Sequence, residues 1–174
     1  GAWEPTTPYF WPKNGKLTFD AYSPIELTGV SCNKATGLTI EKCNLGMRIN
    51  GADAIVINDC VMTDVNNGLE MNGGIQNSVT DCKFGSRNGG VTCLISGESN
   101  LLFCDNHLDG TGNTGLLMTG TVRVNVSDCT VSGDKVGLFE LNGENNLITD
   151  NNFTLKAAED QLAGKSKDYG VIVV

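Results

Sequence analysis

Apolar and polar residues alternate along most of the chain in short runs that recur about every 22 residues. One run of six has the form apolar, any, Asp, Cys or Asn, any, apolar, and its copies begin at Ile57, Val79, Phe103, Val126 and Ile148. We assign an earlier copy to residues 40–45, with Lys42 and Cys43 in the Asp and Cys places. Alternation over a few residues predicts short β-strands with one buried face.

A second pattern lies between the copies of the first and reads apolar, any, apolar, small polar, Gly. Its copies are residues 47–51, 69–73, 93–97, 116–120 and 139–143. Two or three short strands per 22 residues, with Asn, Asp or Gly at the corners, predict a chain that coils around its own core. The predicted fold is therefore all-β, a parallel β-helix (solenoid) of six to eight coils.

Two stretches depart from the repeat. Residues 1–22 hold six of the 11 aromatic side chains and three of the four prolines, so we expect a cap over the open end of the solenoid. A partner-binding arm is the alternative. The solenoid itself is expected over residues 23–174, with an insertion at about 155–167 that favours a short helical turn. Inserted loops often carry function in solenoids, although a solvated bulge is the simpler interpretation.

Charge and hydropathy narrow the function classes. The 174-residue chain has a formal net charge of −8, which argues against nonspecific binding to nucleic acid or to an anionic membrane. No apolar run reaches the roughly 18 residues of a membrane-spanning helix, so we expect no membrane association. The sequence opens Gly-Ala-Trp without Met, and we therefore expect a processed or excised piece of a longer protein.

The seven cysteines, an odd number, favour free thiols over a disulfide framework and indicate folding in a reducing cytoplasm. We expect Cys43, Cys60 and Cys82 to stack as small buried residues at one corner of successive coils, where a disulfide between neighbours is the alternative. His107 is the only histidine and no Cys-x-x-Cys pair occurs, so no zinc site and no cofactor are expected.

Aspartates recur at one predicted corner and would form a ladder of carboxylates about 4.8 Å apart. They are Asp59, Asp81, Asp105, Asp128 and Asp150. A calcium row is one interpretation, because hard cations take several oxygen ligands. The other is that each aspartate closes its own turn. We prefer the turn role, which explains why every coil has one, and expect no metal.

The second pattern also predicts which side chains point outward. One outward column comprises Arg48, Glu70, Leu94, Leu117 and Glu140, and its neighbour comprises Asn50, Asn72, Ser96, Thr119 and Asn142. Short hydroxyl and amide groups in a flat array suit a glycan, with a plain solvated sheet as the alternative. The candidate ligand-binding residues are Asn72, Ser96, Thr119 and Asn142. The adjacent Leu94 and Leu117 predict a subunit interface, and we expect a homotrimer.

Carboxylates are the candidates for glycoside chemistry, which needs two acids roughly 5–9.5 Å apart. Glu70 and Glu140 would lie about 14 Å apart, at three coils, which is too far for a pair within one chain. Glu98, Asp109 and Asp134 are expected on nearby loops, where acids of two subunits could meet. The candidate catalytic residues are Glu70, Glu98 and Asp109. For Glu70 we prefer an exposed ion pair with the arginine one coil earlier, and the catalytic role is the alternative.

Several blocks resemble the right-handed β-helix of inulin fructotransferases, namely residues 50–54, 90–92, 141–143, 146–149 and 168–171. The resemblance covers roughly residues 45–174. It implies a right-handed β-helix in a secreted trimer that cleaves a fructan with intramolecular transfer, using carboxylates at subunit boundaries. Glu70 matches a family glutamate, but the other two expected acids fall on Gly89 and near Ser99. Loss of an acid would remove acid–base or nucleophilic action.

The chain is also similar to the trimeric β-helices of phage tailspikes and adhesins, which bind cell-surface polysaccharide. Because the expected acid pair is not intact, the sequence favours a binding module for a polysaccharide or cell-surface glycan. Such a module would be the rod of a trimeric adhesin or tailspike, located outside the cell or on a virion surface. A fructan-processing enzyme of the inulin fructotransferase type and a purely structural solenoid are the alternatives.

Overall fold

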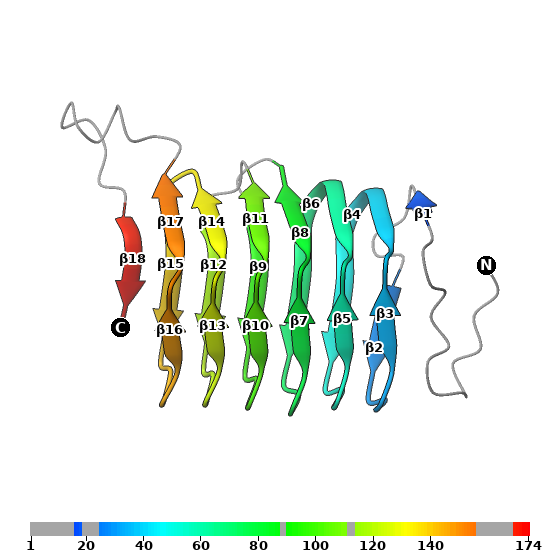
Figure 1. Ribbon diagram of the computed structural model, residues 1–174, viewed down its shortest axis with the longest axis horizontal. Helices are drawn as coiled ribbons and strands as arrows, with labels where there is room; N and C mark the ends of the chain where they lie inside the picture. Colours follow the sequence, from blue (N-terminus) through cyan, green and yellow to red (C-terminus); the bar gives the residue numbers. More distant parts are fainter. Residues whose placement is uncertain (1–15, 19–24, 88–89, 111–113, 156–168) are drawn as a thin grey trace.

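The computed structural model describes residues 16–18, 25–87, 90–110, 114–155 and 169–174. Every regular element among them is a β-strand, and the strands stack as a parallel β-helix of about six coils. Figure 1 shows the coils advancing side by side from β2 at one end of the rod to β18 at the other. The predicted all-β parallel solenoid is confirmed.

Each coil contributes to two sheets. The six-stranded sheet contains β3 (Lys34–Thr36), β5 (Val56–Asn58), β7 (Ser78–Thr80), β10 (Leu102–Cys104), β13 (Asn125–Ser127) and β16 (Leu147–Thr149). The twelve-stranded sheet contains β1 (Lys16–Thr18), β2 (Ile25–Thr28), β4 (Thr39–Asn50), β6 (Val61–Asn72), β8 (Lys83–Ser86), β9 (Val91–Ser96), β11 (His107–Gly110), β12 (Thr114–Thr119), β14 (Thr130–Gly133), β15 (Val136–Leu141), β17 (Asn152–Leu155) and β18 (Tyr169–Val173).

The register of the strands confirms the first sequence pattern in five coils. The first residues of its copies pair in order along the six-stranded sheet: Ile57, Val79, Phe103, Val126 and Ile148. The aspartate ladder lies at one corner, where all five aspartates have φ between 53° and 57°. Because Asp tolerates this left-handed conformation better than most residues, the predicted corner position is confirmed.

The predicted first copy of this pattern is wrong by five residues. Ala35, and not Ile40, pairs with Ile57, while Cys43 pairs with Val65 in the adjacent strand. A glycine and a leucine occupy the two corner positions of this coil in place of Asp and Cys, so the six-residue pattern does not match there. Cys43 is therefore buried as predicted but does not stack on Cys60.

The other corner residues of the pattern stack as predicted. The backbone N–H of Cys60 donates to Sγ of Cys82 at 3.5 Å, and both thiols are buried. One coil further, Asn106 occupies the same place, where its Oδ1 accepts from the N–H of Cys82 at 3.0 Å. Its Nδ2 donates to the carbonyl of Val79 at 2.9 Å. A buried amide thus joins two coils where a small thiol otherwise fills the corner.

The last copy of the second pattern is shifted by one residue from the prediction. Leu117 pairs with Phe139 and Thr119 with Leu141, so Phe139 points outward and Glu140 points inward, where it is 7% exposed. Asn142 takes the glycine corner with φ of 54°. Because asparagine tolerates this left-handed conformation, it can replace the corner glycine. The pattern, which requires glycine at the corner, therefore matches one residue too late.

The core is a continuous stack of apolar side chains inside the coils. Inward residues of successive coils pair directly, as for Ile49, Met71, Ile95 and Met118, all fully buried. The rings of Phe84 and Phe103 stack at the centre with centroids 6.4 Å apart. Burying each large apolar side chain contributes about 1.5–3 kcal/mol.

Two predicted segments fall largely outside the described residues. Of the expected N-terminal cap at residues 1–22, only β1 is described, and it pairs in parallel with β4. The expected insertion at 155–167 is described only at Leu155, the last residue of β17. No helix in the described part of the chain is long and apolar enough to cross a membrane.

Candidate functional site

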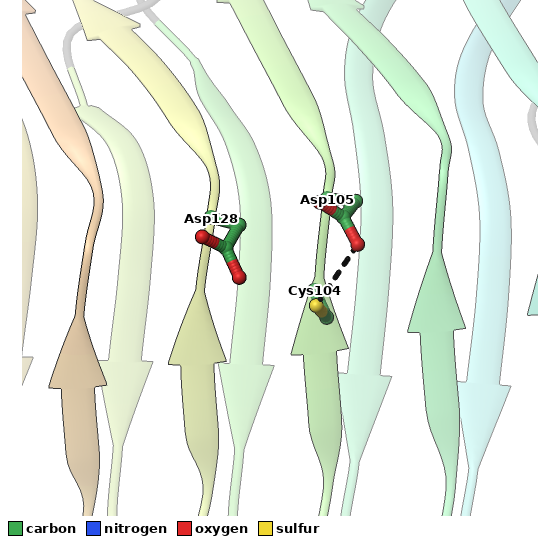
Figure 2. Close-up of side chains that lie close together, drawn as sticks. All are labelled: Cys104, Asp105 and Asp128. Carbon is green, nitrogen blue, oxygen red and sulfur yellow. Dashed lines mark hydrogen bonds between the residues drawn. The ribbon is translucent and has the colours of Figure 1, made fainter.

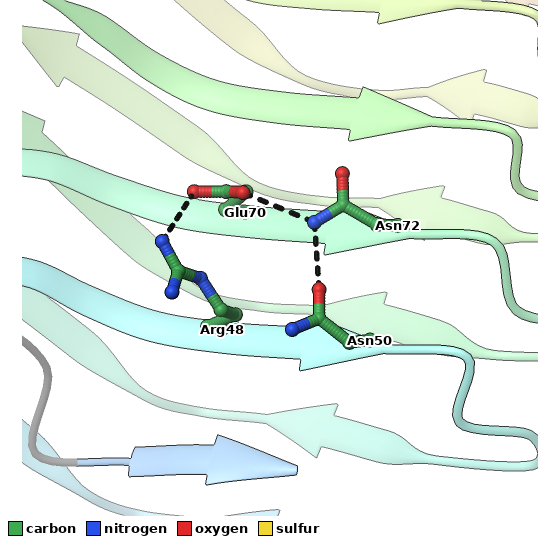
Figure 3. Close-up of polar contacts among 4 residues, drawn as sticks. All are labelled: Arg48, Asn50, Glu70 and Asn72. Atoms are coloured by element: carbon green, nitrogen blue, oxygen red, sulfur yellow. Dashed lines mark hydrogen bonds and ion pairs between the residues drawn. The ribbon is translucent and has the colours of Figure 1, made fainter. Parts of the chain in front are cut away.

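A polar ladder lies on the outer surface of β4 and β6 (Figure 3). Nη2 of Arg48 lies 3.4 Å from Oε2 of Glu70, and the two side chains are 23% and 27% exposed. Nδ2 of Asn72 donates to Oε1 of Glu70 at 3.0 Å and to Oδ1 of Asn50 at 2.8 Å. The predicted ion pair is present, so Glu70 is held by two partners within its own surface.

The predicted ligand-binding column continues from this ladder for two more coils. Asn72 pairs with Ser96, which pairs with Thr119, and all three side chains are half-buried at the outer surface. Asn142 does not belong to the column, because the shifted register places Leu141 there. The outward array thus holds an amide, two hydroxyls and then an apolar residue.

The neighbouring column changes from charged to apolar halfway along. After Arg48 and Glu70 it continues with Leu94, Leu117 and Phe139, which are half-buried and pair with one another across β9, β12 and β15. The outward position of Leu94 and Leu117 is as predicted. The sequence pattern does not predict an outward Phe139, because its last match, at residues 139–143, lies one residue beyond the true repeat. We call these three residues the apolar stripe.

Glu98 lies on the loop between β9 and β10, as expected, but its side chain is buried inside a corner of the solenoid. Its side chain is fully buried, and its Oε2 accepts from Nδ2 of Asn77 at 3.1 Å. Gly74 leaves the space, since a Cβ there would lie 3.0 Å from Oε1 of Glu98. Burial raises the pKa of Glu98 to about 7, although hydrogen bonds from Asn77 and Gly74 lower it. Buried in this way, Glu98 does not face a substrate at the outer surface.

The resemblance places two further acids where this chain has Gly89 and Ser99, and only Ser99 is among the described residues. Ser99 lies beside Glu98 and forms parallel bridges with Ile75 and Val122, which makes it part of the coil stacking. Gly89 lies outside the described residues.

Asp109, the third candidate acid, lies in a groove on the outer surface of β6, β8 and β11. The groove has a volume of about 440 Å³ and is lined by Val61, Thr63, Lys83, Phe84, Gly85, His107 and Asp109. Lys83 and His107 are paired on adjacent coils, as are Gly85 and Asp109. Oγ of Ser132 donates to Oδ1 of Asp109 at 3.3 Å, which orients the carboxylate.

One further group of metal-type donors lies at the aspartate corner (Figure 2). Donor atoms of Cys104, Asp105 and Asp128 lie within 4.8 Å of one another, and Sγ of Cys104 donates to Oδ2 of Asp105 at 3.2 Å. A hydrogen bond with Ser127 lowers the pKa of the Cys104 thiol, but partial burial and the two carboxylates raise it overall. The thiol therefore keeps its proton more readily than an ordinary cysteine.

The family described as periplasmic copper-binding protein (NosD) matches residues 12–169, nearly the whole chain. The chain belongs to the NosD family. No curated protein matches it.

Solved structures similar to this NosD-family chain are β-helices. The crystal structure of DFA-IIIase from Arthrobacter chlorophenolicus A6 superposes with a TM-score of 0.57 at 19% identity, covering 68% of this chain and 30% of that one. The same enzyme in complex with DFA-III gives a TM-score of 0.59 at 18% identity, covering 69% and 30%. This chain thus spans less than a third of those proteins. The predicted resemblance to the inulin fructotransferase β-helix is confirmed for the fold.

The copper in the family's description can be tested against the donors of this chain. Cu(I) favours thiolate and thioether ligands. All four methionines and five of the seven cysteines are buried in the core. Cys104 has two carboxylates and no second soft donor in its cluster. The described residues therefore do not fit a copper site of this kind, and we derive no function through copper.

Proposed function

We propose that this NosD-family β-helix binds a polysaccharide or cell-surface glycan on its outer surface. The groove of β6, β8 and β11 is the observation that carries the proposal, because it brings hydroxyl, ammonium, imidazole and carboxylate groups together over an open floor. Sugars need both donors and acceptors held in fixed positions. Parallel strands fix those positions better than loops do.

The polar column on the next part of the sheet supports the same function. Asn72, Ser96 and Thr119 offer amide and hydroxyl groups at the repeat of the coils, about 4.8 Å apart. A glycan chain that lies along the rod would contact such an array at several units. DFA-IIIase, whose β-helix is similar, has been crystallised in complex with DFA-III, and this supports a ligand site on this architecture.

The proposed assembly is a homotrimer that forms the rod of an adhesin or tailspike outside the cytoplasm. The apolar stripe supports association, since Leu94, Leu117 and Phe139 form one contiguous apolar surface. The family's periplasmic description agrees with a location outside the cytoplasm.

The test is to incubate the protein with inulin and with bacterial surface polysaccharides, and to measure retention on glycan columns together with any small products. Retention without products is the expected result. Release of a difructose anhydride would replace the binding function with a fructan-processing activity, for which Glu70 and Asp109 are the accessible acids. Neither retention nor products would leave a purely structural solenoid.

A further inference from the structure

The floor of the groove is open because Gly85 has no side chain, although the backbone does not require glycine there. A Cβ on Gly85 would lie 3.4 Å from the carbonyl oxygen of Met62 and 3.7 Å from that of Asp109, which are ordinary contacts. Its φ is not in the left-handed region. At Gly133, by contrast, a Cβ would lie 2.0 Å from the carbonyl oxygen of Val136. Gly85 therefore shapes the surface and not the fold.

The side chains around this floor are complementary to each other in hydrogen bonding. Lys83 offers only donors, whereas the Asp109 carboxylate offers only acceptors. They lie on adjacent coils and two residues apart along the strand, a diagonal of about 8 Å between backbone positions. Two neighbouring sugar hydroxyls can bind between these two side chains, one to each, because each hydroxyl both donates and accepts. His107 and Val61 border the same space.

The charges beside the groove favour a neutral ligand over an anionic one. The corner aspartates Asp81 and Asp105 precede Lys83 and His107 by two residues each, and Asp109 itself lines the groove. A carboxylated sugar would meet these acids on a chain with a net charge of −8. The volume of about 440 Å³ lies toward the small end of ligand pockets, which span about 300–1,000 Å³. This limits the deepest part of the groove to one or two sugar rings.

We propose that the groove is a subsite for a neutral sugar ring, which binds through two vicinal hydroxyls between Lys83 and Asp109 above Gly85. The proposal rests on the proposed glycan-binding function and specifies its ligand class and its residues. His107 adds a hydrogen bond at the side, and Val61 contacts the apolar face of the ring.

The experiment measures binding by the full chain with NMR, following the Gly85 amide and the His107 ring during titration with fructose, mannose or galactose. Galacturonate is the anionic comparison. We expect saturable shifts with at least one neutral sugar and weaker binding of galacturonate.

Gly85→Val fills the floor of the groove and should weaken sugar binding at least tenfold. Thr154→Val is the matched control, because Thr154 lies in the same outward column three coils beyond Gly85, outside the groove.

Circular dichroism and thermal melting establish that each variant is folded. If Gly85→Val does not fold, Asp109→Asn takes its place, since it removes the charge and keeps the acceptor for Ser132. Three results would overturn the subsite and leave the glycan-binding function intact: unchanged binding by the folded variant, tighter binding of galacturonate, or no shifts in a protein that is retained on a polysaccharide column. No shifts and no retention would overturn both proposals.

Discussion

The inside and the outside of the coils follow the same register but differ in how much their chemistry varies. One inward column is apolar over four successive coils, in Ile49, Met71, Ile95 and Met118, and continues with the buried Glu140. The outward column beside it changes along the rod from Arg48 and Glu70 to Leu94, Leu117 and Phe139. Each inward residue is therefore restricted by the residues above and below it, whereas the outward residues are free to carry binding groups.

Glu98 and Glu140 are the exceptions inside the coils. Both carboxylates are buried, and each accepts a hydrogen bond from a corner asparagine, Asn77 or Asn146. A buried acid is costly unless it is hydrogen-bonded or protonated. Each of these buried acids thus has an amide partner, from the preceding coil for Glu98 and from the same coil for Glu140.

The largest effect is expected from truncating the centre of the core. Phe103→Ala removes a fully buried ring that stacks on Phe84, and should reduce the free energy of unfolding by about 3–5 kcal/mol. The outward Phe139→Ala should cost less than about 1 kcal/mol in the monomer. Urea denaturation of both variants measures the difference. Equal losses would show that the two sides of the coil are equally restricted.

A smaller effect, dependent on pH, is expected from the buried acid. Because the pKa of Glu98 is raised from 4.5 to about 7 in the folded chain, the native state keeps a proton between these pH values that the unfolded chain releases. Stability should therefore fall as the pH rises from about 4.5 to 7, by up to about 3 kcal/mol. In Glu98→Gln this loss should disappear. Denaturation at several pH values tests this, with the exposed Glu144→Gln as the control; a persistent loss in Glu98→Gln would contradict it.

The corner amide should contribute less than the core ring. Asn106→Ala leaves the N–H of Cys82 and the carbonyl of Val79 without their partner, at a cost of about 1–3 kcal/mol. Asn106→Cys should cost less, because cysteine occupies the equivalent corner at Cys60 and Cys82. Thermal melting ranks the two variants. A cysteine variant no more stable than the alanine variant would show that corner filling does not matter.

The repeat could be predicted from sequence wherever a coil carries its full signature. Asp59, Asp81 and Asp128 indicated the corners correctly because few other residues tolerate that turn. The first and last coils failed for the same physical reason, since Gly37 and Asn142 satisfy the left-handed corner with a different residue type. A motif that requires one residue type at the corner does not match a coil in which another residue adopts the same conformation.

The candidate site was less predictable than the fold. Asp109 was identified as a candidate acid, but the groove around it depends on the missing side chain of Gly85 and on residues of three coils. The burial of Glu98 depends likewise on Gly74 one coil earlier. A sequence pattern predicts where side chains point, but it does not predict where a missing side chain leaves a cavity.

The smallest effect on the fold, with the largest on assembly, is expected at the apolar stripe. Leu117→Lys places a charge on a half-buried outward position, so the free energy of unfolding of the monomer should change by no more than about 0.5 kcal/mol. If the stripe forms the trimer interface, the lysines would be desolvated there, and light scattering should show dissociation. Asn72→Lys, on the polar column of the same sheet, is the matched control and should leave the trimer intact. Dissociation by both variants, or by neither, would place the interface elsewhere on the rod.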